Sequence, residues 1–140
     1  MEALGRLFNI IPTADAVEVN MRDCSAITFL CVGGNAETFT LAQATDAAGS
    51  GAVTLSTITR YYANSAAAGA TTWSLVEIAA GGVVTTTTAL PVAVIHVSGT
   101  ELSDGFDYLR VSSSSTGTVV AITHDLDVQR SPVNLPALGV

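Results

Sequence analysis

Residues 36–43 read AETFTLAQ, and this stretch shows the pattern that decides the fold. Phe39 and Leu41 are large and apolar, and Thr38 and Thr40 alternate with them. Successive side chains of a strand point to opposite faces of a sheet. The alternation therefore predicts a strand with one buried face and one polar face. Residues 92–97, VAVIHV, are almost continuously apolar, which is typical of a strand in the middle of a β-sandwich.

The same reasoning along the chain predicts strands at residues 16–22, 25–32, 36–43, 54–62, 72–79, 83–88, 92–98, 106–113 and 117–130. Segments rich in Gly, Asn, Asp and Ser separate them and supply the turns. Many short strands at this spacing indicate a sandwich or a barrel. We predict an all-β fold, an antiparallel β-sandwich of about eight or nine strands with a jelly-roll-like arrangement, over residues 15–130. In the last strand we expect Val120, Ile122, Leu126 and Val128 to share one face with His124.

Two terminal segments lie outside this pattern, residues 1–14 and residues 131–140, and we interpret both as extended arms. The last ten residues carry no charge and two prolines, which lack the N–H that a helix or a central strand needs. Burying four aliphatic side chains there contributes roughly 6–12 kcal/mol, whereas ordering ten residues costs roughly 10–20 kcal/mol. We therefore expect the arms to become ordered through assembly. The residues expected to bind a partner are Phe8, Ile10, Ile11, Val133, Leu135, Leu138 and Val140.

The composition excludes several kinds of partner. Hydrophobic residues make up 49% of the chain, charged residues only 12%, and the net charge is -7 with no lysine. This balance repels nucleic-acid phosphates and offers no basic patch to an anionic membrane. The longest uncharged stretch, residues 78–100, contains Gly81, Gly82 and Pro91, so we do not expect it to cross a membrane. A low charge content fits a permanent protein interface instead.

No catalytic or metal-binding motif is visible. His124 and Asp125 are adjacent, so in a strand they point to opposite faces and the carboxylate cannot orient the imidazole. His96, Cys24 and Cys31 show none of the close pairing typical of zinc sites. The two cysteines are seven residues apart, which predicts opposite faces of one strand and two buried, reduced thiols. We expect no enzyme activity, no metal and no cofactor.

Aromatic residues are few, and three of them allow two interpretations. Tyr61 and Tyr62, together with Trp73, could form a patch on which a sugar stacks. The alternative is that these rings fill the core, with a phenol reaching a polar partner.

Three segments resemble the small structural proteins of tailed-bacteriophage virions. They are NIIPTADAV at residues 9–17, ITRYY at residues 58–62, and the ending that runs from DGFDYLRV at residues 104–111 through HDLDVQRSPVNLPAL at residues 124–138. The chain is more similar to capsid decoration (cement) or minor capsid proteins than to any enzyme. The resemblance implies a β-rich body on the outer surface of a capsid, often as a trimer, with no catalytic residues. It implies as partners the major capsid protein and further copies of the chain, which is made in the host cytoplasm and becomes part of the virion.

Our leading hypothesis is therefore a decoration protein that stabilises a phage capsid through its body and its arms. A tail-tube or head–tail connector subunit is the first alternative, for which residues 64–71 offer a candidate loop. The second alternative, from another class, is a carbohydrate-binding module that uses Tyr61, Tyr62 and Trp73.

Overall fold

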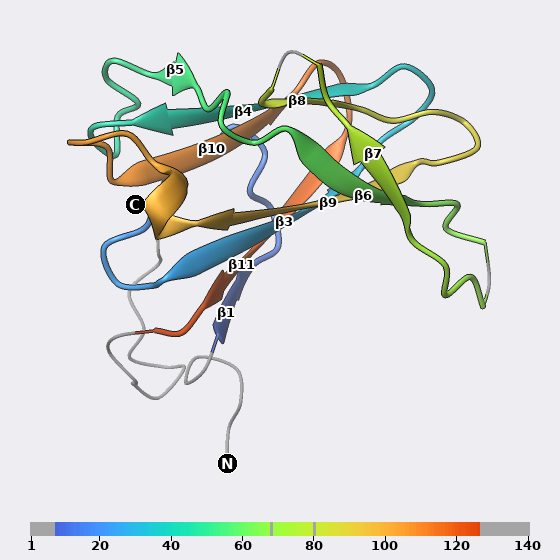
Figure 1. Cartoon of the computed structure of the whole chain (residues 1–140), viewed down its shortest axis with the longest axis horizontal. Coiled ribbons are helices and arrows are strands. Elements are labelled where there is room, and N and C mark those ends of the chain that lie inside the picture. The colour runs from blue at the N-terminus through green and yellow to red at the C-terminus, as the bar shows by residue number, and fades with distance from the viewer. Residues whose placement is uncertain (1–7, 68, 80, 127–140) are drawn as a thin grey trace.

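The structure, a computed structural model, describes residues 8–67, 69–79 and 81–126. Within these residues, eleven strands and one short 3₁₀ helix, η1, form two antiparallel layers (Figure 1). The strands are β1 (Phe8–Ile11), β2 (Val19–Asn20), β3 (Ala26–Val32), β4 (Thr38–Ala44), β5 (Val53–Thr54), β6 (Arg60–Asn64), β7 (Ser74–Glu77), β8 (Val83–Thr85), β9 (Val92–Ser98), β10 (Tyr108–Ser113) and β11 (Thr118–His124), with η1 at Gly99–Glu101. The all-β, antiparallel prediction is confirmed. The strand count exceeds the eight or nine expected, because β1 falls in the predicted N-terminal arm and the single strand predicted at residues 54–62 corresponds to two strands, β5 and β6.

The two sheets share one hydrophobic core. The six-stranded sheet has the order β1-β11-β3-β9-β6-β7, and the five-stranded sheet has the order β2-β10-β4-β5, with β8 also paired to β4. Phe29 and Ile95 of the first sheet and Phe39, Leu41 and Val111 of the second are fully buried in a single cluster. The arrangement is therefore that of a sandwich, with apolar side chains of both sheets facing each other.

The alternation that predicted β4 is confirmed. Phe39 and Leu41 have no exposed surface, while Thr38 and Thr40 are half-buried on the other face. The strand β9 is central, as expected, because it pairs with β3 on one side and β6 on the other. Its apolar run is still one-sided, since His96 on the face away from the core is exposed. A central position in the sheet thus does not cover both faces of this strand.

The N-terminal segment belongs to the sheet from Phe8 onward, where an extended arm had been expected. The strand β1 pairs with β11 over Phe8↔His124 to Ile11↔Ala121. Beyond it, Ala14 is fully buried and its amide donates to the Val119 carbonyl at 2.8 Å. Residues 1–7 and the predicted C-terminal arm, residues 131–140, lie outside the described residues.

The prediction that Val120, Ile122 and His124 share one face of the last strand is confirmed, but Leu126 does not belong to that face. The core side of β11 carries Val119, Ala121 and Thr123, whereas Ile122 and His124 lie on the opposite, half-buried side together with Val120. Both faces of this strand carry β-branched residues, so the sequence pattern does not distinguish them, and a shift by one residue inverts every side chain. Leu126 is nonetheless buried, because Asp125 has a φ of 50° and ends the strand before it. Val128 lies outside the described residues.

The cysteines are both buried in the core rather than on opposite faces of one strand. Cys31 lies in β3, whereas Cys24 precedes that strand, where the chain turns, and its Sγ contacts the Asn20 carbonyl at 3.7 Å. The two form no disulfide. Burial raises the pKa of the Cys31 thiol to about 12.

Candidate functional site: the outer face of the six-stranded sheet

The six-stranded sheet has an outer face, turned away from the five-stranded sheet, and this face gathers exposed apolar side chains. Six large hydrophobic residues stand out as exposed in the described part of the chain: four of them belong to strands of this face, and a fifth, Trp73, lies directly before β7. These five are Ile10 (40% exposed), Val32 (41%), Tyr62 (50%), Trp73 (44%) and Leu75 (51%), and we call them the outer-face cluster. The sixth, Val53, lies in β5 of the other sheet. Exposed apolar residues scattered singly need no explanation, but a contiguous group marks an interaction surface.

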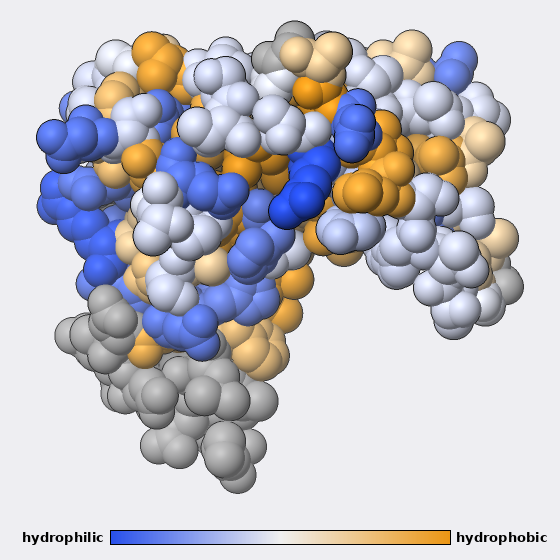
Figure 2. Space-filling model, viewed as in Figure 1, coloured by the Kyte–Doolittle hydropathy of each residue, from blue (hydrophilic) through white to orange (hydrophobic). Residues whose placement is uncertain are grey.

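Register joins part of this cluster into a continuous apolar row. Val120, Leu30, Val94, Tyr62 and Leu75 face one another in that order across β11, β3, β9, β6 and β7. Residues directly opposite in neighbouring strands lie about 4.5–5.5 Å apart at Cβ, so their side chains touch. Figure 2 shows that the molecule is hollowed on the side below β9 and β6, and that apolar atoms border this hollow.

A polar group lies beside the apolar row. The Thr28 hydroxyl in β3 stands between His96 Nδ1 in β9, at 2.9 Å, and His124 Nε2 in β11, at 2.8 Å. A threonine hydroxyl has one proton to donate, so at least one imidazole must donate an N–H to the Thr28 oxygen. The two rings are 5.9 Å apart between centroids. Burial and the neighbouring His96 lower the pKa of His124, while Asp125 opposes the shift. The arrangement thus disfavours a positive charge on His124.

A groove opens where β6 and β9 stop pairing. The strand β9 pairs with β3 along seven residues, but with β6 only from Tyr62↔Val94 to Asn64↔Val92. Where this pairing is absent, a hollow of about 1030 Å³ lies between residues 57–62, which lead into β6, and residues 94–101, which include the end of β9 and η1. The Thr57 hydroxyl closes its other end by donating to the Glu101 carbonyl at 3.2 Å. We call this hollow the β6–β9 groove.

The groove is lined by both polar and apolar side chains. The lining includes three charged residues, Arg60, Glu77 and Glu101, the rings of Tyr62 and His96, and the hydroxyls of Thr57, Thr59, Ser98 and Thr100. Arg60 and Glu77 are opposite in register, yet within the described residues they form no ion pair. Glu101 is fixed by η1, since its Oε2 accepts the Ser98 amide at 2.7 Å. Arg60 and Glu77 are therefore available to a ligand in the groove, whereas Glu101 already uses one carboxylate oxygen within the chain.

The three aromatic residues singled out in the sequence do not form one patch. Tyr61 is 8% exposed, points into the core, and donates its hydroxyl proton to the Thr85 carbonyl at 3.0 Å. Tyr62 is exposed on the outer face, and Trp73 is exposed directly before β7. The two earlier interpretations thus each describe part of the group: one ring fills the core and two remain at the surface.

The predicted partner-binding residues are also divided. Ile10 belongs to the outer-face cluster, and Phe8 lies on the same side of β1 and is half-buried. Ile11 points the other way and packs against the core. Val133, Leu135, Leu138 and Val140 lie outside the described residues.

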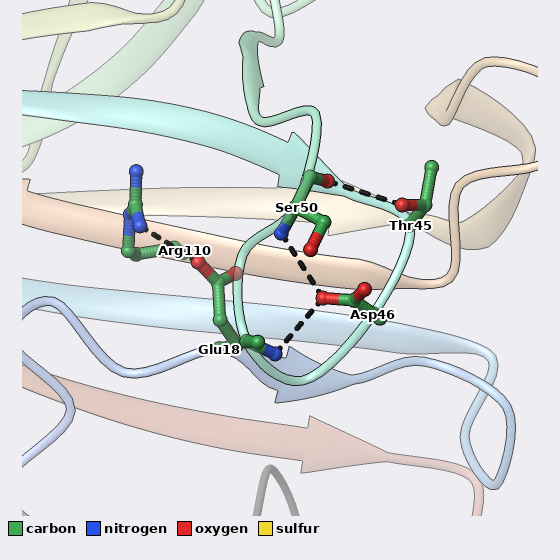
Figure 3. A network of polar contacts seen from close by, with 6 residues as sticks. Glu18, Thr45, Asp46, Ser50 and Arg110 are labelled. Carbon is green, nitrogen blue, oxygen red and sulfur yellow. Dashed lines mark hydrogen bonds and ion pairs between the residues drawn. The ribbon is translucent and has the colours of Figure 1, made fainter.

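A second polar cluster lies on the other sheet, beneath the loop that joins β4 to β5 (Figure 3). Glu18 is 6% exposed and accepts a hydrogen bond from Arg110 Nη1 at 2.8 Å. Above it, Asp46 accepts the amides of Ala48 and Ser50 at 2.9 and 3.0 Å. Burial raises the pKa of Glu18 although Arg110 opposes this, and the hydrogen bonds from Ser50 lower the pKa of Asp46. All the bonds of Asp46 fold its own loop, so we assign this cluster a structural role.

The groove and the histidine pair were missed by sequence analysis. His96 and His124 are 28 residues apart, and only the register of β9 and β11 against β3 brings both to Thr28. The groove depends on where pairing between β6 and β9 ends, for which the sequence carries no visible signal. In the described part of the chain, no three His, Cys, Asp or Glu side chains gather where they could hold a metal ion. None of the described helical residues forms a segment long and apolar enough to span a bilayer.

Comparison of the chain with family models, with curated proteins and with solved structures finds no match.

Proposed function

We propose that this chain is a structural protein of a phage virion, which binds the outside of the capsid through the outer face of its six-stranded sheet and stabilises the shell. The observation that carries the proposal is the outer-face cluster, in which Tyr62 and Leu75 are 50% and 51% exposed on one side of the sheet and Trp73, directly before β7, is 44% exposed. Leaving such a group in water is unfavourable, and burial against a partner recovers about 25 cal/mol for each Å² of apolar surface.

The composition supports the same proposal. Permanent interfaces are depleted in charged residues at their centre, and only 12% of this chain is charged. The partners are the major capsid protein and further copies of the chain, arranged as trimers. Phe8 and Ile10 extend the binding surface to β1. The proposal includes a jelly-roll-like order in which the chain passes from one sheet to the other. It is supported by strands that are adjacent in a sheet but distant in the sequence, such as β3 and β11 or β4 and β10.

Copy number in purified virions tests this role directly. We expect hundreds of copies per particle in gel densitometry against the major capsid protein, because a decoration protein covers the whole shell. A dozen copies or fewer would contradict the proposal. Salt dependence of shell binding is a second test. An apolar interface predicts little change between low and high salt, since screening acts on charges.

A tail-tube or connector subunit remains the second candidate because of the β6–β7 hairpin. The chain between these strands, residues 65–73, has the sequence SAAAGATTW without a charged residue, and Figure 1 shows the hairpin reaching away from the body. A projecting hairpin of this kind is what stacked rings use to contact one another. Rings or tubes of purified protein in negative-stain images would favour this candidate, whereas monomers or trimers favour decoration.

A further inference from the structure

We propose that the β6–β9 groove is a binding site for a neutral saccharide, with the Tyr62 ring as the surface on which a sugar ring stacks. The site is tested on the free protein, because Tyr62 also belongs to the outer-face cluster and a shell bound there would cover it.

The first argument is the position of Tyr62. Its ring is 50% exposed and lines the groove next to Val94, its partner in β9. Tyrosine offers a rigid apolar face with a polar tip. One face of a pyranose ring presents C–H groups, and these pack on such an aromatic face.

The second argument is the supply of hydrogen-bonding groups around that ring. The carboxylates of Glu77 and Glu101 accept hydrogen bonds from sugar hydroxyls, and the Arg60 guanidinium donates them. The Thr59 hydroxyl can both donate and accept. The Thr57 hydroxyl, which donates to the Glu101 carbonyl, can accept, and the hydroxyls of Ser98 and Thr100, which bond to each other at 3.1 Å, can accept and have one proton left to donate. A ligand with many hydroxyls matches this lining better than an apolar molecule does.

The third argument concerns charge and size. The groove carries two carboxylates against one guanidinium, and the whole chain has a net charge of -7, so an acidic sugar or a phosphate is disfavoured. The volume of about 1030 Å³ is just above the usual range for small-molecule sites, about 300–1,000 Å³. A short oligosaccharide of a few units fits this space.

The full-length protein on an array of neutral and acidic glycans, followed by saturation-transfer NMR with the best hit, tests the proposal. We expect binding to neutral glycans, with saturation transferred to the sugar C–H protons. Tyr62→Ala should weaken binding at least about tenfold, while Tyr62→Phe, which keeps the ring, should bind nearly as well. Glu77→Gln should also weaken binding, because the charged acceptor makes the stronger hydrogen bond.

Leu75→Ala provides the matched control. Leu75 is opposite Tyr62 in β7 and equally exposed, but it does not line the groove. We expect it to leave glycan binding unchanged and to weaken shell binding, which separates this site from the proposed function. The proposal is overturned if no neutral glycan binds at millimolar concentration, if only acidic glycans bind, or if Tyr62→Ala binds as tightly as the unmodified chain.

Discussion

Replacing Trp73 by alanine is expected to weaken binding to the capsid without destabilising the fold. A large aromatic side chain buries about 150–250 Å² when it is fully covered, and 44% of Trp73 is exposed. A partner that covers this exposed part therefore removes about 100 Å² of Trp73 surface from water. At 25 cal/mol per Å² this amounts to about 2.5 kcal/mol, or roughly a 60-fold change in the dissociation constant. The unfolding free energy should stay within about 0.5 kcal/mol, as for other surface substitutions.

The assay is co-sedimentation of the purified chain with shells from which this protein has been removed, over a range of concentrations. Val53→Ala is the matched control, since Val53 is 47% exposed but lies on the other sheet. We expect Val53→Ala to bind like the unmodified protein. If Trp73→Ala also stays within about twofold of it, the outer face does not contact the shell and the reasoning is refuted.

Three further predictions concern the folded chain itself. Because the folded-state pKa of His124 is lowered, its contribution to stability is present above its unfolded value of about 6.5 and is lost as the pH falls through the folded pKa. Urea unfolding at pH 7.5 and 5 should therefore show a smaller acid loss for His124→Gln than for the unmodified chain. Gly49→Ala should cost about 1–3 kcal/mol more than Gly51→Ala in urea unfolding; both have positive φ, but only at Gly49 would a Cβ lie 2.6 Å from a Glu18 oxygen. The Cys31 thiol, with a pKa of about 12 and no exposed surface, should resist a thiol reagent at pH 8 until the protein is unfolded, and rapid labelling of the native chain would contradict this placement.

Sequence patterns predicted those strands best whose two faces differ in polarity. In β4 only the face with Phe39 and Leu41 is apolar, while Thr38 and Thr40 lie on the other face. The strand can therefore turn only the first face to the core, as it does in the structure. In β11 both faces are β-branched, so the choice between Thr123 and His124 for the core was not determined by the strand itself. That choice depends on β3 and β1, which pair with β11 from both sides.

The candidate site was harder to predict from the sequence than the fold. Nothing about the adjacent tyrosines Tyr61 and Tyr62 tells which one faces the core, and the structure separates them by the simple alternation of β6. The contact of Thr28 with two histidines joins three strands. The β6–β9 groove exists because β6 and β9 pair over only three residues of each strand. A single sequence does not show where the pairing of two strands ends.

The pairing of β1 with β11 affects when this protein can fold during synthesis. Phe8 faces His124, so 116 residues (124 minus 8) separate two neighbours in the sheet. The strand β3 must wait for both of its neighbours, β9 and β11, which are made 60 to 98 residues later (Ala26 faces Ser98 and His124, and Val32 faces Val92 and Thr118). Chains rich in such distant contacts fold slowly, on a scale of milliseconds to seconds. The nascent chain thus exposes apolar β3 until β9 and β11 have been made, and the six-stranded sheet closes only after β11 has emerged.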